Sequence, residues 1–179
     1  MYVFSPYGSI YRASKQASET IIEAFSEQYK LNYTFLRYGS LYGPRAQAWN
    51  GLKNRVETIV NKKKLTYYGT GMEEREYIHI KDAANMTVKA LSDKYINQAV
   101  TLTGSQVINS KALIEMIFEI ANIKLDIEYK NPNKTNIKHY IKTPYRYTPK
   151  QSKKISPNEY IDFGQGLLEV IAEAYKKNN

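Results

Sequence analysis

Tyr11-Arg12-Ala13-Ser14-Lys15 decides the fold when it is read with Arg37-Tyr38-Gly39-Ser40-Leu41-Tyr42-Gly43-Pro44 downstream. Apolar residues at helical spacing follow the first stretch, which predicts a helix over about residues 11–29. On one helix, a spacing of four places Tyr11 and Lys15 on the same face, one turn apart. A cation beside a phenol stabilises the phenolate, so the pair has the chemistry of a proton-transfer device. With 17 tyrosines and 26 Lys+Arg residues such pairs also arise by chance, so the surrounding sequence has to decide.

Three motifs follow one another in that surrounding sequence. They are Tyr11-x-x-x-Lys15-x-x-x-Glu19, the run from Leu36 to Arg45, and Arg75-Glu76-Tyr77-Ile78-His79-Ile80-Lys81-Asp82. Together they resemble the extended short-chain dehydrogenase/reductases, and within these the NAD-dependent nucleotide-sugar epimerase/dehydratase family, of the UDP-glucose 4-epimerase kind. The resemblance implies an α/β fold: the C-terminal part of a Rossmann-type extended short-chain dehydrogenase with its small α/β substrate-binding domain.

Composition narrows the function classes. A chain of 179 residues can form one full core or two small ones. Its formal charge of +9 favours anionic partners, and nucleic acid is the weaker choice because the basic clusters at 62–64, 150–154 and 176–177 accompany no nucleic-acid motif. The absence of cysteine excludes disulfides and thiolate catalysis. No run approaches the roughly 18 apolar residues of a membrane span and no signal-peptide pattern is present, so we expect a cytoplasmic protein that does not enter a membrane.

Periodicity predicts further elements along the chain. We expect strands over 31–38, 65–68, 76–80, 99–102 and 125–129, and helices over 52–60, after Asp82, after Ser110 and over 165–176. Asp82 and Ser110 are the expected caps. The expected inward faces are Leu52, Val56, Ile59 and Val60; Ala84, Val88 and Leu91; Leu113, Ile114, Ile117 and Ala121; and Leu167, Leu168, Ile171, Ala172 and Tyr175. Residues 130–160 read as a long loop.

The dinucleotide-binding part of the resemblance is missing. Its family opens with a glycine-rich turn for the cofactor pyrophosphate, and nothing before Tyr11 supplies one. Gly69-Thr70-Gly71 has no third glycine, and Met72-Glu73-Glu74 would put carboxylates where phosphates sit, so it reads as a turn. We therefore expect a truncated chain: residues 1–46 as a remnant of the dinucleotide-binding domain, and 47–179 mainly as the substrate domain, with about 82–104 returning to the Rossmann sheet.

The resemblance also implies site residues. Tyr11 and Lys15 would be the general acid/base and the lysine that stabilises its phenolate while holding the nicotinamide ribose of NAD, with Tyr38 and Ser40 also at the cofactor. Arg75 would contact the diphosphate of a nucleotide sugar, a task that suits a planar guanidinium, although a surface ion pair with a neighbouring glutamate is the alternative. The remaining implied substrate residues are Ser40, Tyr42, Asn50, Leu52 and Arg146. The two histidines, His79 and His139, lie 60 positions apart without cysteines, so we expect no metal site.

Two hypotheses of different class remain at this point. The first is NAD-dependent epimerisation or dehydration of a nucleotide sugar, UDP-linked by resemblance, in a chain that lacks the pyrophosphate site and is expected to be inactive alone. The second is a non-catalytic fragment that binds a nucleotide diphosphate or self-associates. Self-association is expected because missing sheet neighbours would expose the apolar stripe of the first helix, formed by Ala13, Ala17, Ile21, Ala24 and Phe25, and the edge of the strand at 31–38.

Overall fold

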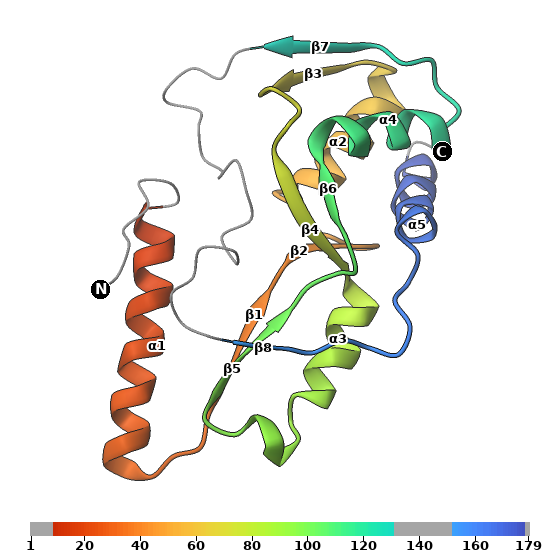
Figure 1. Cartoon of the computed structure of the whole chain (residues 1–179). Coiled ribbons are helices and arrows are strands. Elements are labelled where there is room, and N and C mark those ends of the chain that lie inside the picture. Colours follow the sequence, from red (N-terminus) through yellow and green to blue (C-terminus); the bar gives the residue numbers. More distant parts are fainter. Residues whose placement is uncertain (1–8, 131–151, 178–179) are drawn as a thin grey trace.

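The computed structural model describes residues 9–130 and 152–177 (Figure 1). The elements in chain order are α1 (Ser9–Tyr29), β1 (Thr34–Tyr38), β2 (Ser40–Tyr42), α2 (Gly51–Lys62), β3 (Leu65–Tyr68), β4 (Glu74–His79), α3 (Ile80–Lys89), a 3-10 turn (Asp93–Tyr95), β5 (Gln98–Leu102), β6 (Val107–Asn109), α4 (Ser110–Ile120), β7 (Ile127–Lys130), β8 (Lys153–Lys154) and α5 (Phe163–Lys176). The mixed α/β architecture agrees with the predicted fold class.

Three small sheets carry these strands. The first has the order β1-β5-β8 and is parallel throughout, with Leu36 beside Val100. In the second, β2 pairs parallel to β4, which pairs antiparallel to β6. The third joins β3 and β7 in parallel. Among the described residues β1 is an edge strand, as the sequence predicts, because only β5 pairs with it.

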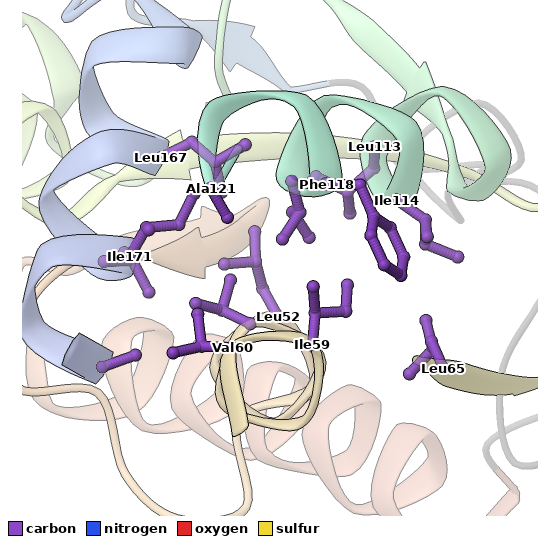
Figure 2. Packing of buried hydrophobic residues seen from close by; sticks show 14 of the residues in the cluster. Leu52, Ile59, Val60, Leu65, Leu113, Ile114, Phe118, Ala121, Leu167 and Ile171 are labelled. Carbon is purple, nitrogen blue, oxygen red and sulfur yellow. The ribbon is translucent and has the colours of Figure 1, made fainter. Parts of the chain in front are cut away.

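The larger of two hydrophobic cores lies between α2, α4 and α5 (Figure 2). Its side chains include Leu52 and Ile59 from α2, Phe118 from α4 and Leu167 from α5, which are nearly or completely buried. The predicted inward faces of α2 and α4 are confirmed in full, because every member of each is buried. These helices are held by tertiary packing of one apolar face, as short amphipathic helices usually are.

The smaller core packs α3 against β5 and β1. Here the predicted inward face of α3 is wrong: Ala84 is exposed, Val88 is 68% exposed and Leu91 is 80% exposed. The buried residues are instead Ala83, Met86 and Ala90, which lie on a neighbouring face of the helix. The sequence around α3 is apolar on two faces, so periodicity alone could not choose between them.

The caps of two helices differ from the prediction. The side chain of His79, not Asp82, caps α3 by accepting a hydrogen bond from the backbone N–H of Lys81. Asp82 is buried and accepts from the N–H of Ile161, which ties α3 to the segment before α5. Asn109, not Ser110, caps α4. In each case a side chain still accepts from an otherwise unpaired N–H of the first turn.

The predicted inward face of α5 is only partly correct. Leu167 and Ile171 are buried, but Leu168 and Tyr175 are more than 40% exposed and Ala172 is exposed. Val170 and Ala174 complete the buried face instead. Gly166 lies where α5 comes closest to β2 and β4, because a Cβ there would be 2.5 Å from the Tyr42 hydroxyl.

The first helix, α1, turns a polar stripe toward the sheet. Its half-buried side chains are Gln16, Glu19, Glu23 and Ser26, spaced three or four apart. The apolar stripe that the sequence identified lies on other faces and is exposed, as expected, with Ile21 57% and Phe25 53% accessible. A cavity of about 520 Å³ is lined by residues of α1, β1 and β5, among them Glu23, Phe35 and Arg37.

No helix within residues 9–130 and 152–177 combines the length and the apolar character that a membrane crossing needs.

Candidate functional site

Tyr11 and Lys15 lie one above the other on the first turns of α1. The Lys15 ammonium is 5.4 Å from the centroid of the Tyr11 ring, a cation–π distance. Both side chains are exposed, Tyr11 by 69%. The predicted juxtaposition of the two side chains is therefore present, and the pair faces solvent rather than a core.

A bidentate ion pair fixes the direction of the helix that carries them. Arg37 of β1 donates from Nε and Nη2 to the two carboxylate oxygens of Glu19, at 2.9 and 2.7 Å. Glu19 lies one turn beyond Lys15 on α1. The side chains of Arg37 and Glu19 are only 13% and 22% exposed. The fork of a guanidinium fixes the carboxylate in orientation as well as in distance. This contact therefore sets where α1 stands on β1, and with it the place of Tyr11 and Lys15.

The end of β1 and the start of β2 carry Tyr38 and Ser40. Tyr38 is half-buried, and its hydroxyl shares a hydrogen bond with the hydroxyl of Thr87 on α3. Tyr38 is thus on the face of β1 opposite Arg37 and α1, because alternate residues of a strand point to opposite faces. Ser40 is half-buried and stands beside Tyr77 in the β2–β4 register.

Tyr42 is a core residue in this structure. It is 3% exposed, and its ring lies 5.2 Å from His79, 6.1 Å from Tyr77 and 5.0 Å from Phe163, between centroids. Burial, followed by the nearby carboxylates of Asp82 and others, raises the pKa of Tyr42 well above its usual value. Tyr42 is therefore a neutral packing residue that joins β2, β4 and α5.

His79 occupies the same junction. Its Nδ1 caps α3, and its Nε2 has no hydrogen-bond partner and lies 3.6 Å from a Glu169 oxygen. Burial lowers the pKa of His79 below its ordinary value, although the charge of Glu169 opposes the shift. The neutral imidazole is thus the favoured form, which agrees with the structural role that the sequence suggested.

Asn50 and Leu52 have structural tasks at the start of α2. The Asn50 side chain accepts from the N–H of Lys53 as the N-cap and donates to the carbonyl of Leu41. Leu52 is 3% exposed, within the larger core. The structure therefore uses both residues to hold α2 beside β2.

Arg75 is on β4 and is half-buried. One of its guanidinium nitrogens donates to the carbonyl of Glu74 at 2.7 Å. Tyr77, two positions on, shares its face of the strand, and the Tyr77 hydroxyl lies 3.4 Å from a guanidinium nitrogen of Arg55 on α2. The other predicted substrate arginine, Arg146, lies outside the described residues.

The Gly69-Thr70-Gly71 turn is filled by a carboxylate of the chain itself. Glu73 accepts from the backbone N–H groups of Thr70 and Gly71 and from the hydroxyls of Thr70 and Tyr67. Burial acts against the charge of Glu73, but these hydrogen bonds prevail and hold its pKa below the usual value. Because the amides already bind an anion, the turn does not fit the pyrophosphate of NAD. The sequence interpretation of this segment as a structural turn is confirmed.

Within residues 9–130 and 152–177, no three His, Cys, Asp or Glu side chains gather in a group that could hold a metal ion.

Comparison with known proteins places the chain in a family. The model of the NAD-dependent epimerase/dehydratase family matches residues 3–101, which include the helix of Tyr11 and Lys15 and the strand of Arg75. The chain belongs to this family. The recognition made from three sequence motifs is thereby confirmed, and so is the nucleotide-sugar epimerase/dehydratase character of its relatives.

Relatives and solved structures agree with this membership. The chain is 26% identical to the UDP-glucuronate 4-epimerase of Thermodesulfobacterium geofontis, over 91% of this chain and 49% of that protein. It is 26% identical to human dTDP-D-glucose 4,6-dehydratase, over 94% and 48%. The fold is similar to that of UDP-glucose 4-epimerase from Thermotoga maritima, with a TM-score of 0.74 at 23% identity over 99% of this chain and 56% of that chain. It is also similar to a UDP-glucuronic acid 4-epimerase from Bacillus cereus in complex with NAD, with a TM-score of 0.75 at 19% identity over 99% and 55%.

The chain spans about half the length of the relatives and structures that it matches. No role for Arg37 or Arg55 was predicted from the sequence. A signal for Arg55 was present, because it lies three residues after Leu52 and four before Ile59, at the margin of the core-facing side of α2.

Proposed function

We propose that this chain forms the substrate-binding portion of a nucleotide-sugar epimerase or dehydratase and contributes Tyr11 and Lys15 to its proton transfers. The observation that carries the proposal is that the family match includes both the α1 pair and the β4 strand of Arg75. In this proposal residues 1–46 and about 82–104 belong with the dinucleotide-binding half, and the rest of 47–179 with the substrate half. The two separate hydrophobic cores support that division.

The proposed roles follow from the chemistry of the side chains. Arg75 holds the diphosphate of the nucleotide sugar, since a guanidinium can donate two parallel hydrogen bonds to phosphate oxygens. Tyr11 exchanges a proton with a hydroxyl of the sugar, and Lys15 beside it stabilises the phenolate between transfers. The Glu19–Arg37 pair keeps α1 in the position that the exchange requires. NAD is the cofactor that the family implies, and the amides of the Gly69-Thr70-Gly71 turn are already bound to Glu73, so we assign this chain no step that passes through NAD.

Calorimetric titration with UDP and with NAD tests this proposal. We expect UDP to bind and Arg75→Ala to weaken its binding by about 10- to 150-fold, because a hydrogen bond to a charged group contributes about 1.5–3 kcal/mol. We expect NAD to show no binding. The matched control is Lys62→Ala, which removes an exposed charge at the last turn of α2. NAD binding would show that a cofactor site is present after all, and UDP binding that is insensitive to Arg75 would contradict the assigned role.

We also propose that two copies of the chain associate through the outer face of α1. Ile21, Phe25 and Tyr29 are each more than 50% exposed on this helix, and apolar clusters of this kind usually mark interaction surfaces. A two-fold dimer would let the same stripe cover itself. Light scattering at micromolar concentration should show a dimer, and Phe25→Glu should convert it to a monomer, whereas Val88→Glu on the exposed side of α3 should not. A monomeric wild-type protein would contradict this proposal.

A further inference from the structure

The side chain of Arg55 is directed into the protein rather than into solvent. Arg55 is on α2 between the buried residues Leu52 and Ile59 and is itself half-buried. Its guanidinium carbon is 5.5 Å from the centroid of the Tyr67 ring on β3, and one of its nitrogens is 3.4 Å from the Tyr77 hydroxyl on β4. The side chain therefore spans from the helix to two neighbouring sheets.

No carboxylate pairs with this guanidinium among residues 9–130 and 152–177, although Arg37 and Lys53 both have such partners there. The remaining segments, 1–8, 131–151 and 178–179, contain no Asp or Glu. A phenol at 3.4 Å is a long contact for a charged donor, and a guanidinium has five N–H donors in all. Arg55 thus keeps most of its donors, and its charge, available to an anion.

The place of Arg55 relative to Arg75 indicates which anion. Arg75 and Tyr77 are two apart on β4, so their side chains leave the strand on the same face, about 7 Å apart. Arg55 reaches that face from α2 and meets Tyr77 there. The Arg55 guanidinium therefore lies between the rings of Tyr67 and Tyr77, on the face of β4 from which the Arg75 side chain also leaves.

We propose that Arg55 is a second phosphate-binding residue of the nucleotide site, so that a diphosphate is held by one arginine from α2 and one from β4. Two guanidinium forks can each bind oxygens of a different phosphate of one diphosphate. The adjacent tyrosine rings offer apolar faces for the nucleoside. This inference rests on the proposed function, because it assigns Arg55 to the same ligand as Arg75.

Three ligands and three variants separate the possibilities. We would titrate UDP, UMP and uridine into the wild-type chain, Arg55→Gln, Arg55→Lys and the exposed-charge control Lys62→Gln. Arg55→Gln should weaken UDP at least tenfold, weaken UMP less and leave uridine unchanged. It should also lower the salt dependence of UDP binding, since one fewer cation contacts the ligand. Arg55→Lys should recover part of the affinity, because it keeps the charge but loses the fork.

Other outcomes would overturn the assignment. If Arg55→Gln weakens uridine and UDP equally, Arg55 acts by supporting Tyr67 and Tyr77 and does not bind phosphate. If UDP binding is weakened by Arg75→Ala but not by Arg55→Gln, the proposed function stands and the role of Arg55 is wrong. If the wild-type chain binds no UDP, both are wrong. Thermal unfolding of each variant gives the control for folding, and Arg55→Lys keeps the test decisive if the Gln variant does not fold.

Discussion

Removing one partner of the Glu19–Arg37 ion pair should release α1 from the sheet without unfolding the rest of the chain. The variants are Glu19→Gln and Arg37→Gln, singly and together. The pair makes two charge-assisted hydrogen bonds, at 2.9 and 2.7 Å, with side chains only 13% and 22% exposed. The cost of breaking it should therefore lie between that of a surface pair, about 0–1 kcal/mol, and that of a fully buried pair, about 3–5 kcal/mol.

We expect each single variant to cost about 1.5–3 kcal/mol. This corresponds to a roughly 10- to 150-fold larger population in which α1 is detached, at 1.4 kcal/mol for each factor of ten. The effect should concentrate on α1 because its stripe toward the sheet is polar and a cavity lies beside the pair, so little apolar packing opposes detachment. Once detached, α1 loses the tertiary contacts from which helices in proteins draw most of their stability.

Hydrogen exchange followed by mass spectrometry measures the detachment of α1 directly. Peptides from α1 should exchange faster by that factor, and peptides from α4 in the larger core should not change. Lys111→Gln is the control, because it removes one side of an exposed ion pair with Glu115. The double variant should cost less than the sum of the two single ones, since it leaves no unpaired charge. Unchanged exchange in α1, or strict additivity, would refute the view that this pair holds the helix.

Two further predictions concern the junction of Tyr42, His79 and α5. Gly166→Ala should destabilise the chain by about 1–3 kcal/mol, because the new Cβ would lie 2.5 Å from the Tyr42 hydroxyl. The control is Gly51→Ala, whose Cβ meets nothing within 4 Å and which should be neutral or slightly stabilising. Denaturant unfolding measures the free energy of unfolding of both variants. Since burial lowers the pKa of His79 in the folded chain from 6.5, the unfolded chain binds the proton more readily. Stability should therefore be full above about pH 6.5 and fall as the pH drops toward the folded pKa, and His79→Gln should remove this dependence from unfolding curves measured between pH 5 and 8.

The sequence predicts those helices whose apolar residues lie on a single face. In α2 and α4 the buried and exposed faces are chemically distinct, so the helical period alone identifies Leu52, Ile59, Leu113 and Ile117 as core residues. In α3 and the two residues after it, positions 83, 84, 86, 88, 90 and 91 are all apolar and surround much of the helix. Tertiary contact with β5 then decides which of them are buried, and a local pattern does not contain that contact.

The candidate site was predictable to a similar extent. The spacing of Tyr11 and Lys15 implies their stacking on α1, which the structure shows. The use of Asn50 as a helix cap and the burial of Tyr42 depend on the approach of β2, α2 and α5, which are far apart in sequence. The unpaired state of Arg55 depends in the same way on where the carboxylates of the folded chain lie.

The two hydrophobic cores are interleaved along the chain. The chain runs from β1, beside the smaller core, to α2 in the larger core, and then returns to the smaller core in α3 and β5. It enters the larger core again in α4, contributes Ile155 to the smaller core, and ends with α5 in the larger core. No single cleavage of the backbone separates them. Because segments of one core alternate along the chain with segments of the other, neither core can reach its final packing until elements distant in the sequence have met, and loop closure of this kind slows folding. We therefore expect the two cores to melt in one calorimetric transition, and limited proteolysis to yield no stable half.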